Sequence, residues 1–142
     1  MATTRTATTQ WKGALLDGSG TVSLETSGVG TFEISWPSRA EEANGKTSPE
    51  ELIAAAHSAC FSMALSHGLA QAGTPPQTVQ TTAEVTFQPG QGITGIVLTV
   101  KAQVPGLTPE AFQQAAETAK ANCPVSKALA GTTISLNAEL LD

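Results

Sequence analysis

A stretch of small and apolar residues from Ser48 to Gly73 constrains the fold more than any other part of the chain. Ser48 suits the N-cap of a helix, Pro49 suits its first position, and Glu51 stands where a capping box needs an acidic side chain. Nearly every face of the stretch is apolar or small, which predicts a helix surrounded by protein. It is about 20 residues long, but its histidines, serines and acidic start argue against a membrane segment.

Length and composition limit the classes of protein that fit. We expect the 142 residues to form a single domain, residues 1–142, with its own core. Charged residues make up only 13%, which suggests that surface is buried in an oligomer. A net charge of -5 without any basic cluster argues against a nucleic-acid partner. The N-terminus lacks the apolar core of a signal peptide, so we expect the chain to stay in the reducing cytoplasm.

The hydrophobic pattern predicts an α+β fold in which helices cover one face of an antiparallel sheet. The expected order is three strands, the central helix, two long strands, a second helix and a closing strand. A DGSG run predicts a hairpin between the first two strands. The strands are expected at 10–16, 21–26, 31–36, 78–88, 96–104 and 133–140, the second helix at 108–122, and the main loops at 37–47, 72–76 and 88–95.

The two cysteines are the first candidates for chemistry. Cys60 lies in the middle of the predicted central helix among small apolar residues, which raise the pKa of a thiol and keep it inert unless a cation is near. The candidates for such a cation are His57, one turn back, and Arg39 on the preceding loop. From the residues alone, Cys60 is either an ordinary core cysteine or an activated nucleophile.

Cys123 stands in a different environment, because Pro124 suits the first turn of a short following helix. Cys123 would then be the N-cap of that helix, where the positive end of the helix dipole lowers a thiol pKa. The alternative is a cysteine that merely separates two helices.

Two further residues of the central helix have both a structural and a functional interpretation. His57 precedes Cys60 by three residues, which permits a Cys-His pair or half of a metal site, although a histidine bonded to a neighbouring polar group is the commoner case. Glu50 in the first turn favours the helix dipole. Ten residues of helix put it about 15 Å from Cys60. A role for Glu50 at Cys60 would therefore need a second chain whose helix runs alongside in the opposite direction.

The segment HSACFSMAL, within SPEELIAAAHSACFSMAL, and the later NCPVSKAL resemble the OsmC family (osmotically inducible protein C), relatives of the organic hydroperoxide resistance proteins. The resemblance runs from GTVSLETSG to the closing strand. It implies an OsmC-like fold, an intertwined homodimer in which sheets wrap the long central helices. The first hairpin, KGALLDGSGTV, lacks the arginine of the hydroperoxide resistance branch, which favours the OsmC branch.

The resemblance also implies a function and assigns roles to four residues. It implies a thiol-dependent peroxidase that reduces organic hydroperoxides, with Cys60 as peroxidatic nucleophile and Cys123 as resolving thiol. Arg39 in PSRAEE matches the arginine that holds the thiolate, and Glu50 in SPEEL matches the glutamate that orients it. The implied reductant is a dithiol, which the resemblance suggests is lipoyl-linked, and no cofactor, metal or membrane partner is implied. The alternatives are a redox sensor and a non-catalytic binding dimer of the same fold.

Overall fold

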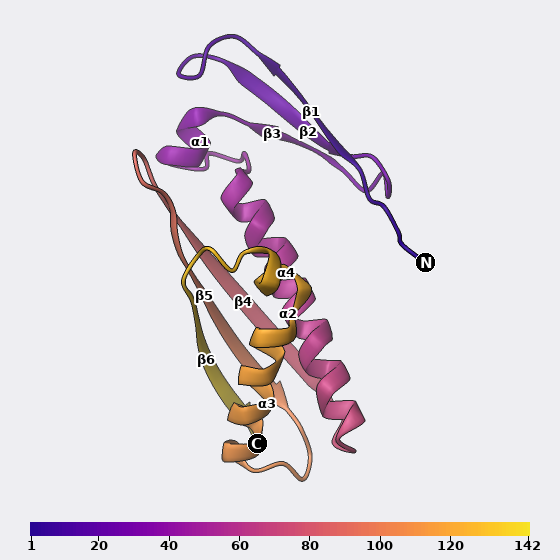
Figure 1. The fold of residues 1–142 in the computed structure, drawn as a ribbon. Coiled ribbons are helices and arrows are strands. Elements are labelled where there is room, and N and C mark those ends of the chain that lie inside the picture. Colours follow the sequence, from indigo (N-terminus) through magenta and orange to yellow (C-terminus); the bar gives the residue numbers. More distant parts are fainter. The chain divides into compact units, whose positions relative to one another are not determined.

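The computed structural model describes residues 1–142 and confirms the α+β class. Three strands are followed by two helices, two strands, two helices and a last strand (Figure 1). The chain forms two compact units, residues 1–52 and residues 53–142, which are described separately.

The first unit holds an antiparallel sheet in the order β1-β2-β3, made by β1 (Ala7–Lys12), β2 (Ser19–Leu24) and β3 (Thr31–Ile34). The hairpin predicted between the first two strands is confirmed, but β1 begins and ends earlier than expected. Leu15 and Leu16 were placed in the strand, yet they lie exposed in the turn. Every residue of β1 is exposed within this chain.

Helix α1 (Trp36–Ala40) replaces part of the predicted loop and the end of the predicted third strand. Its N-cap is Ser35, whose hydroxyl accepts from the Ser38 N–H at 3.2 Å, while the Ser38 hydroxyl accepts from the Ser35 N–H at 3.0 Å. This capping box and Pro37 in the first turn fix the short helix. The Ser38 hydroxyl also contacts the Thr47 carbonyl at 3.0 Å, so the connection that follows is anchored.

Helix α2 (Pro49–Gln71) is the predicted central helix, and it begins as expected: the Glu51 N–H donates to the Ser48 hydroxyl at 3.1 Å. The Glu51 carboxylate does not accept from the Ser48 N–H, as a complete capping box requires. It accepts instead from the Thr47 hydroxyl at 2.6 Å. By length and composition alone, α2 is long and apolar enough to cross a membrane. Of the residues in its most apolar 18-residue stretch, only 22% are buried inside this chain. Within one chain, the prediction of a helix surrounded by protein is therefore wrong.

The second unit holds a sheet in the order β4-β5-β6, made by β4 (Thr78–Gln88), β5 (Gly92–Gln103) and β6 (Ile134–Leu141). The alternation of half-buried and exposed residues predicted for β4 is confirmed. β4 and β5 pair antiparallel, but β5 and β6 pair parallel. The parallel pairing follows from the helices that connect β5 to β6, because parallel strands need a crossover.

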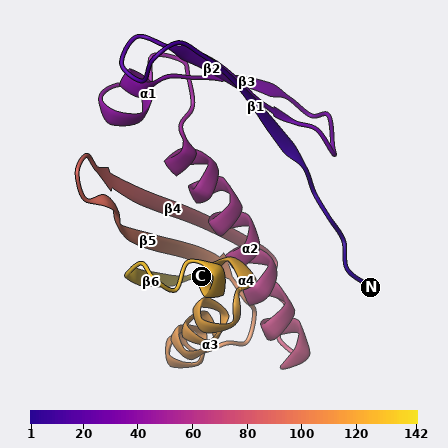
Figure 2. The ribbon, with the colours of Figure 1, turned by 45° about the horizontal axis from the view of Figure 1, so that its top comes forward.

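Helices cover one face of this sheet: α3 (Pro109–Asn122), α4 (Pro124–Ala128) and the part of α2 that belongs to the unit (Figure 2). The predicted caps are confirmed, with Thr108 before α3 and Cys123 between α3 and α4. Between helices and sheet lies one hydrophobic core, which contains Phe61, Leu65, Leu69, Ile96, Leu98, Val100, Ala102, Phe112, Ala116, Ala119 and Cys123.

Candidate functional site

The two cysteines, 63 positions apart in the sequence, meet in the second unit. α2 carries Cys60 and the junction of α3 and α4 carries Cys123, and their sulfur atoms lie 2.9 Å apart. Both are free thiols. A disulfide bond is about 2.05 Å long, so the sulfur atoms need to approach by only about 0.9 Å to form one. The geometry therefore permits reversible closure of a Cys60–Cys123 bond.

The surroundings shift the pKa values of the two thiols in opposite directions. Burial raises the pKa of the Cys60 thiol, and its hydrogen bond with Cys123 raises it further. Burial also acts to raise the pKa of Cys123, but hydrogen bonds from Cys60, Ser126 and Val125 outweigh this and lower it. Within this chain Cys123 is thus the more readily ionised thiol, and the neutral Cys60 thiol donates a hydrogen bond to the Cys123 thiolate. The low pKa predicted for a cysteine at this N-cap agrees with this result.

The hydrogen-bond partner of His57 is not Cys60 but Ser126. Its Nε2 lies 2.8 Å from the hydroxyl oxygen of Ser126, and both side chains are buried, with exposed fractions of 0% and 6%. Burial lowers the pKa of the imidazole, which keeps it neutral. No three His, Cys, Asp or Glu side chains of the chain are placed so that they could hold a metal ion together. His57 is therefore a buried polar residue with one hydrogen bond inside the second unit.

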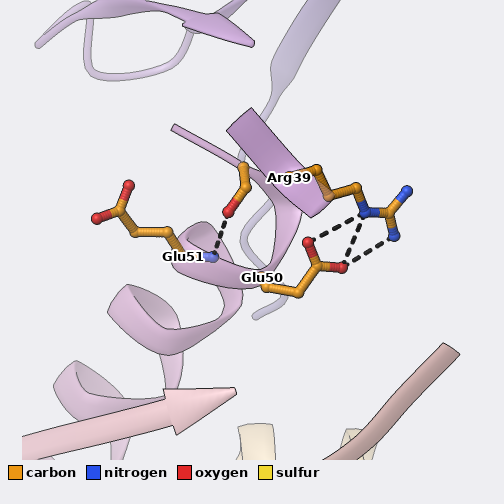
Figure 3. A network of polar contacts seen from close by, with 4 residues as sticks. Arg39, Glu50 and Glu51 are labelled. Carbon is orange, nitrogen blue, oxygen red and sulfur yellow. Dashed lines mark hydrogen bonds and ion pairs between the residues drawn. The ribbon is translucent and has the colours of Figure 1, made fainter. Parts of the chain in front are cut away.

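The first unit contains the other pair of predicted site residues. Arg39, on α1, and Glu50, in the first turn of α2, form a two-pronged ion pair (Figure 3). Arg39 Nε lies 3.0 and 3.1 Å from the two carboxylate oxygens of Glu50, and Arg39 Nη2 lies 2.9 Å from Oε2. Glu50 is buried and Arg39 is partly exposed. A planar guanidinium held in this way has a fixed orientation.

The sequence predicted all four of these residues but missed Ser126. The structure pairs Cys60 with Cys123 and Arg39 with Glu50, each pair within its own unit. Ser126 stands three residues after the N-cap Cys123, but Cys123 makes no side-chain capping hydrogen bond, so this spacing did not single out Ser126.

Comparisons with known proteins place this geometry in a family. The model of the OsmC family, described as OsmC-like protein, matches residues 42–138, a range that includes Glu50, Cys60 and Cys123 and begins three residues after Arg39. Peroxiredoxin OsmC of Escherichia coli strain K12 is 43% identical over 122 residues, which cover 84% of this chain and 85% of the relative. Peroxiredoxin OsmC of Shigella flexneri has the same identity and coverage.

Solved structures agree with the sequence comparison. An organic hydroperoxide resistance protein from Elizabethkingia anophelis has a TM-score of 0.70 at 29% identity, covering 99% of this chain and 100% of that one. An OsmC-like protein from Mycoplasma pneumoniae has a TM-score of 0.76 over the whole of both chains, and its 14% identity supports the fold alone. The chain belongs to the OsmC family, and like its curated relatives it is a peroxidase.

Proposed function

We propose that this peroxidase reduces organic hydroperoxides to alcohols, with Cys60 as the attacking sulfur. Cys60 is only partly buried, whereas Cys123 is 0% exposed, so a peroxide reaches Cys60 more easily. The solved neighbours named as organic hydroperoxide resistance proteins support this class of substrate. The Cys60 thiolate attacks the outer peroxide oxygen, the O–O bond breaks, and the alkoxide leaves and takes up a proton. Cys60 becomes a sulfenic acid.

Cys123 then resolves the sulfenic acid. Its thiolate attacks the Cys60 sulfur, an S–S bond forms, and hydroxide leaves and takes up a proton to become water. The single observation that carries the proposal is the 2.9 Å distance between the two sulfur atoms. An external dithiol restores both thiols and is itself oxidised to a disulfide. The family resemblance favours a lipoyl-linked dithiol.

Activation of Cys60 requires a positive charge, because burial raises its pKa within this chain. Arg39, oriented by Glu50, is the proposed source. Glu50 and Cys60 are separated by ten residues of one continuous helix, or about 15 Å. The Arg39–Glu50 pair would therefore serve Cys60 of a second copy, in a homodimer whose α2 helices run alongside in opposite directions.

Uncovered apolar surface in each unit supports the homodimer. Met63 on α2 is 72% exposed, and a groove of about 600 Å³ between α2 and α3 is lined mostly by small residues such as Ala64 and Gly68. In the first unit Trp11 on β1 and Phe32 on β3 are 38% and 40% exposed. Exposed apolar faces of this kind are typical of protein interfaces.

The function is tested by turnover of cumene hydroperoxide with a dithiol. The wild-type chain should show many turnovers, and Cys60→Ser should show none. In the absence of dithiol, Cys123→Ser should consume about one equivalent of peroxide and keep the sulfenic acid on Cys60, since this variant lacks a resolving thiol. Mass spectrometry of the wild-type chain after one equivalent should find a Cys60–Cys123 disulfide, that is, the loss of two hydrogen atoms.

Two results would contradict the proposal. Activity that survives Cys60→Ser would show that another group reacts with the peroxide. A wild-type chain that consumes about one equivalent in the presence of reductant and then stops would favour the redox sensor. The single domain over residues 1–142, the cytoplasmic location and the absence of nucleic-acid and membrane partners stay predictions.

A further inference from the structure

Two side-chain hydrogen bonds link α2 to α4 and its N-cap, and the proposed thiol chemistry uses only one of them. The used contact joins the two sulfur atoms, 2.9 Å apart. The other joins His57 Nε2 to the Ser126 hydroxyl oxygen at 2.8 Å. His57 precedes Cys60 by three residues on α2. Ser126 follows Cys123 by three residues, so the two contacts lie about one helical turn apart on both sides.

Helix α4 cannot hold its position by itself. It has only five residues, and helices this short are not stable alone. Tertiary contacts therefore set its place, and these include the packing of Val125 and Leu129 against the core and the hydrogen bond between His57 and Ser126. Apolar packing is non-directional, whereas a hydrogen bond weakens steeply when its angle changes. The hydrogen bond is thus the contact that fixes the direction in which the first turn of α4 faces.

His57 fills its place in the core at a cost in stability. The side chain is 0% exposed, and its Nδ1 has no hydrogen-bond partner in the chain. A leucine would occupy the same space without an unpaired buried polar atom. The neutral ring carries one hydrogen, and on Nδ1 it would be a buried N–H without an acceptor, so it belongs on Nε2. Nε2–H then donates to the Ser126 hydroxyl oxygen, and this directed bond to α4 is what the imidazole supplies beyond a leucine.

We propose that His57 is a positioning residue, which through Ser126 holds the first turn of α4 on α2 and keeps the two sulfur atoms within reach of each other. In the closing step the Cys123 thiolate attacks the Cys60 sulfenic sulfur. The S–S bond forms as the S–O bond breaks, and hydroxide leaves and takes up a proton to become water. His57 takes no part in these bonds and acts by limiting the positions open to Cys123. This inference rests on the proposed function, whose disulfide it concerns.

The first test measures the effective concentration of the two thiols toward each other and needs no peroxide. Each chain is equilibrated with reduced and oxidised dithiothreitol at several ratios and quenched in acid, and the disulfide is scored by its loss of two hydrogen atoms. When the protein bond closes, oxidised dithiothreitol takes up the two electrons and two protons. Ser126→Ala and His57→Leu should each lower the effective concentration by about threefold to tenfold, the equivalent of one hydrogen bond. His57→Gln, which keeps an N–H donor, should recover most of it.

The matched control is Ser62→Ala. Ser62 is a partly buried serine of α2 whose hydroxyl lies 2.7 Å from that of Thr81 on β4, so it joins α2 to the sheet and not to α4. This variant should lower the melting temperature and leave the effective concentration within about twofold. The double variant His57→Leu/Ser126→Ala should lose no more than either single variant, because all three remove the same hydrogen bond.

Two outcomes of this test would overturn the proposal. If His57→Leu and Ser126→Ala change only the melting temperature, as the control does, His57 is merely structural. If the loss in the double variant is the product of the two single losses, the two residues act separately and not through their hydrogen bond. Should His57→Leu fail to fold, Ser126→Ala still decides, since an unchanged effective concentration in that chain contradicts the proposal.

The second test times closure of the disulfide after peroxide. Reduced chains are mixed with one equivalent of cumene hydroperoxide and quenched in acid at intervals, and the sulfenic acid is recognised by one added oxygen atom. Ser126→Ala should form the sulfenic acid within about twofold of the wild-type rate and close the disulfide about threefold to tenfold more slowly. Equal closure rates would overturn the proposal. A chain that does not react with peroxide would refute the proposed function instead, while the dithiothreitol measurement still decides the role of His57.

Discussion

Single side chains decide which thiol ionises more readily, and within one chain this is Cys123 and not the proposed nucleophile Cys60. Cys123 has the lowered pKa but is fully buried, whereas the more accessible Cys60 has the raised pKa. A cation must therefore reach Cys60 before it can serve as the nucleophile. Arg39 suits this role because its planar guanidinium is held by two carboxylate oxygens of Glu50.

Removal of the guanidinium should slow the reaction with peroxide. We expect Arg39→Ala to lower kcat/KM for cumene hydroperoxide by about a hundredfold to a thousandfold, the usual effect of losing one donor at a developing charge. Arg39→Lys should recover part of the lost kcat/KM, because an ammonium keeps the positive charge but lacks the planar, two-pronged hydrogen-bonding geometry of a guanidinium. Glu50→Gln should cost about tenfold by loosening the guanidinium. Stopped-flow measurement of peroxide consumption checks these values.

The control is Lys12→Ala, which removes a positive charge from an exposed position of β1 in the same unit. It should leave kcat/KM within about twofold, since exposed charges are screened. Arg39→Ala with an unchanged rate would show that another group activates Cys60.

The two cysteines could be singled out as candidates because each carried a local signal, whereas Arg39 and Glu50 were assigned their roles by the family resemblance. Cys60 and Cys123 are the only two cysteines, and Pro124 marked the N-cap. The contact between them could not be derived from the pattern, because it depends on how α4 packs on α2. The same long-range packing brings His57 to Ser126 across 69 positions, which is why that pair escaped prediction.

Secondary-structure elements were predicted well where the repeating hydrophobic pattern extends over many residues, as in β4 and α3. α1 was missed because its five residues are too few to show a helical repeat of apolar residues. The spacing of Ser35 and Ser38, which is that of a capping box, was the available signal. The parallel pairing of β6 with β5 was missed because the alternation of apolar and polar residues shows which face of a strand is buried. It does not show the direction in which the strand runs. α2 was predicted correctly as a helix, but its apolar outer face has no cover within the chain.

A charge on that outer face should weaken association. Met63 is 72% exposed on α2, and Met63→Lys would place an ammonium in the proposed dimer interface. The desolvation cost of several kcal/mol predicts a dimer dissociation constant raised by at least about a hundredfold. Light scattering over a concentration series measures it. Gln80→Lys, on the exposed polar face of β4, should leave the dimer intact. An undisturbed Met63→Lys dimer would exclude this face as the interface.

At the scale of the whole molecule, the two units carry complementary halves of the proposed chemistry. The unit of residues 1–52 holds the Arg39–Glu50 pair, and the unit of residues 53–142 holds the two thiols. A homodimer in which each copy lends its cation to the other would complete two identical sites, as expected of a symmetric interface.

Mixed dimers test this exchange directly. Cys60→Ser and Arg39→Ala chains, each nearly inactive alone, are co-expressed with two different tags. If Arg39 acts on the other copy, one of the two sites in a mixed dimer is complete. Random pairing makes about half of the dimers mixed, so about a quarter of the wild-type activity should return. If Arg39 served its own Cys60, no mixed dimer would hold a complete site and the activity would stay at background.

The unbroken run of α2 from Glu50 to Cys60 has a consequence for how this chain can change over evolutionary time. One residue inserted between them would turn Glu50 by about 100° and shift it by about 1.5 Å relative to Cys60. In the proposed dimer that single insertion would displace the cation at both sites at once. The ten residues from Glu50 to Cys60 therefore set a fixed spacing, and this part of α2 should tolerate substitutions but no insertions or deletions.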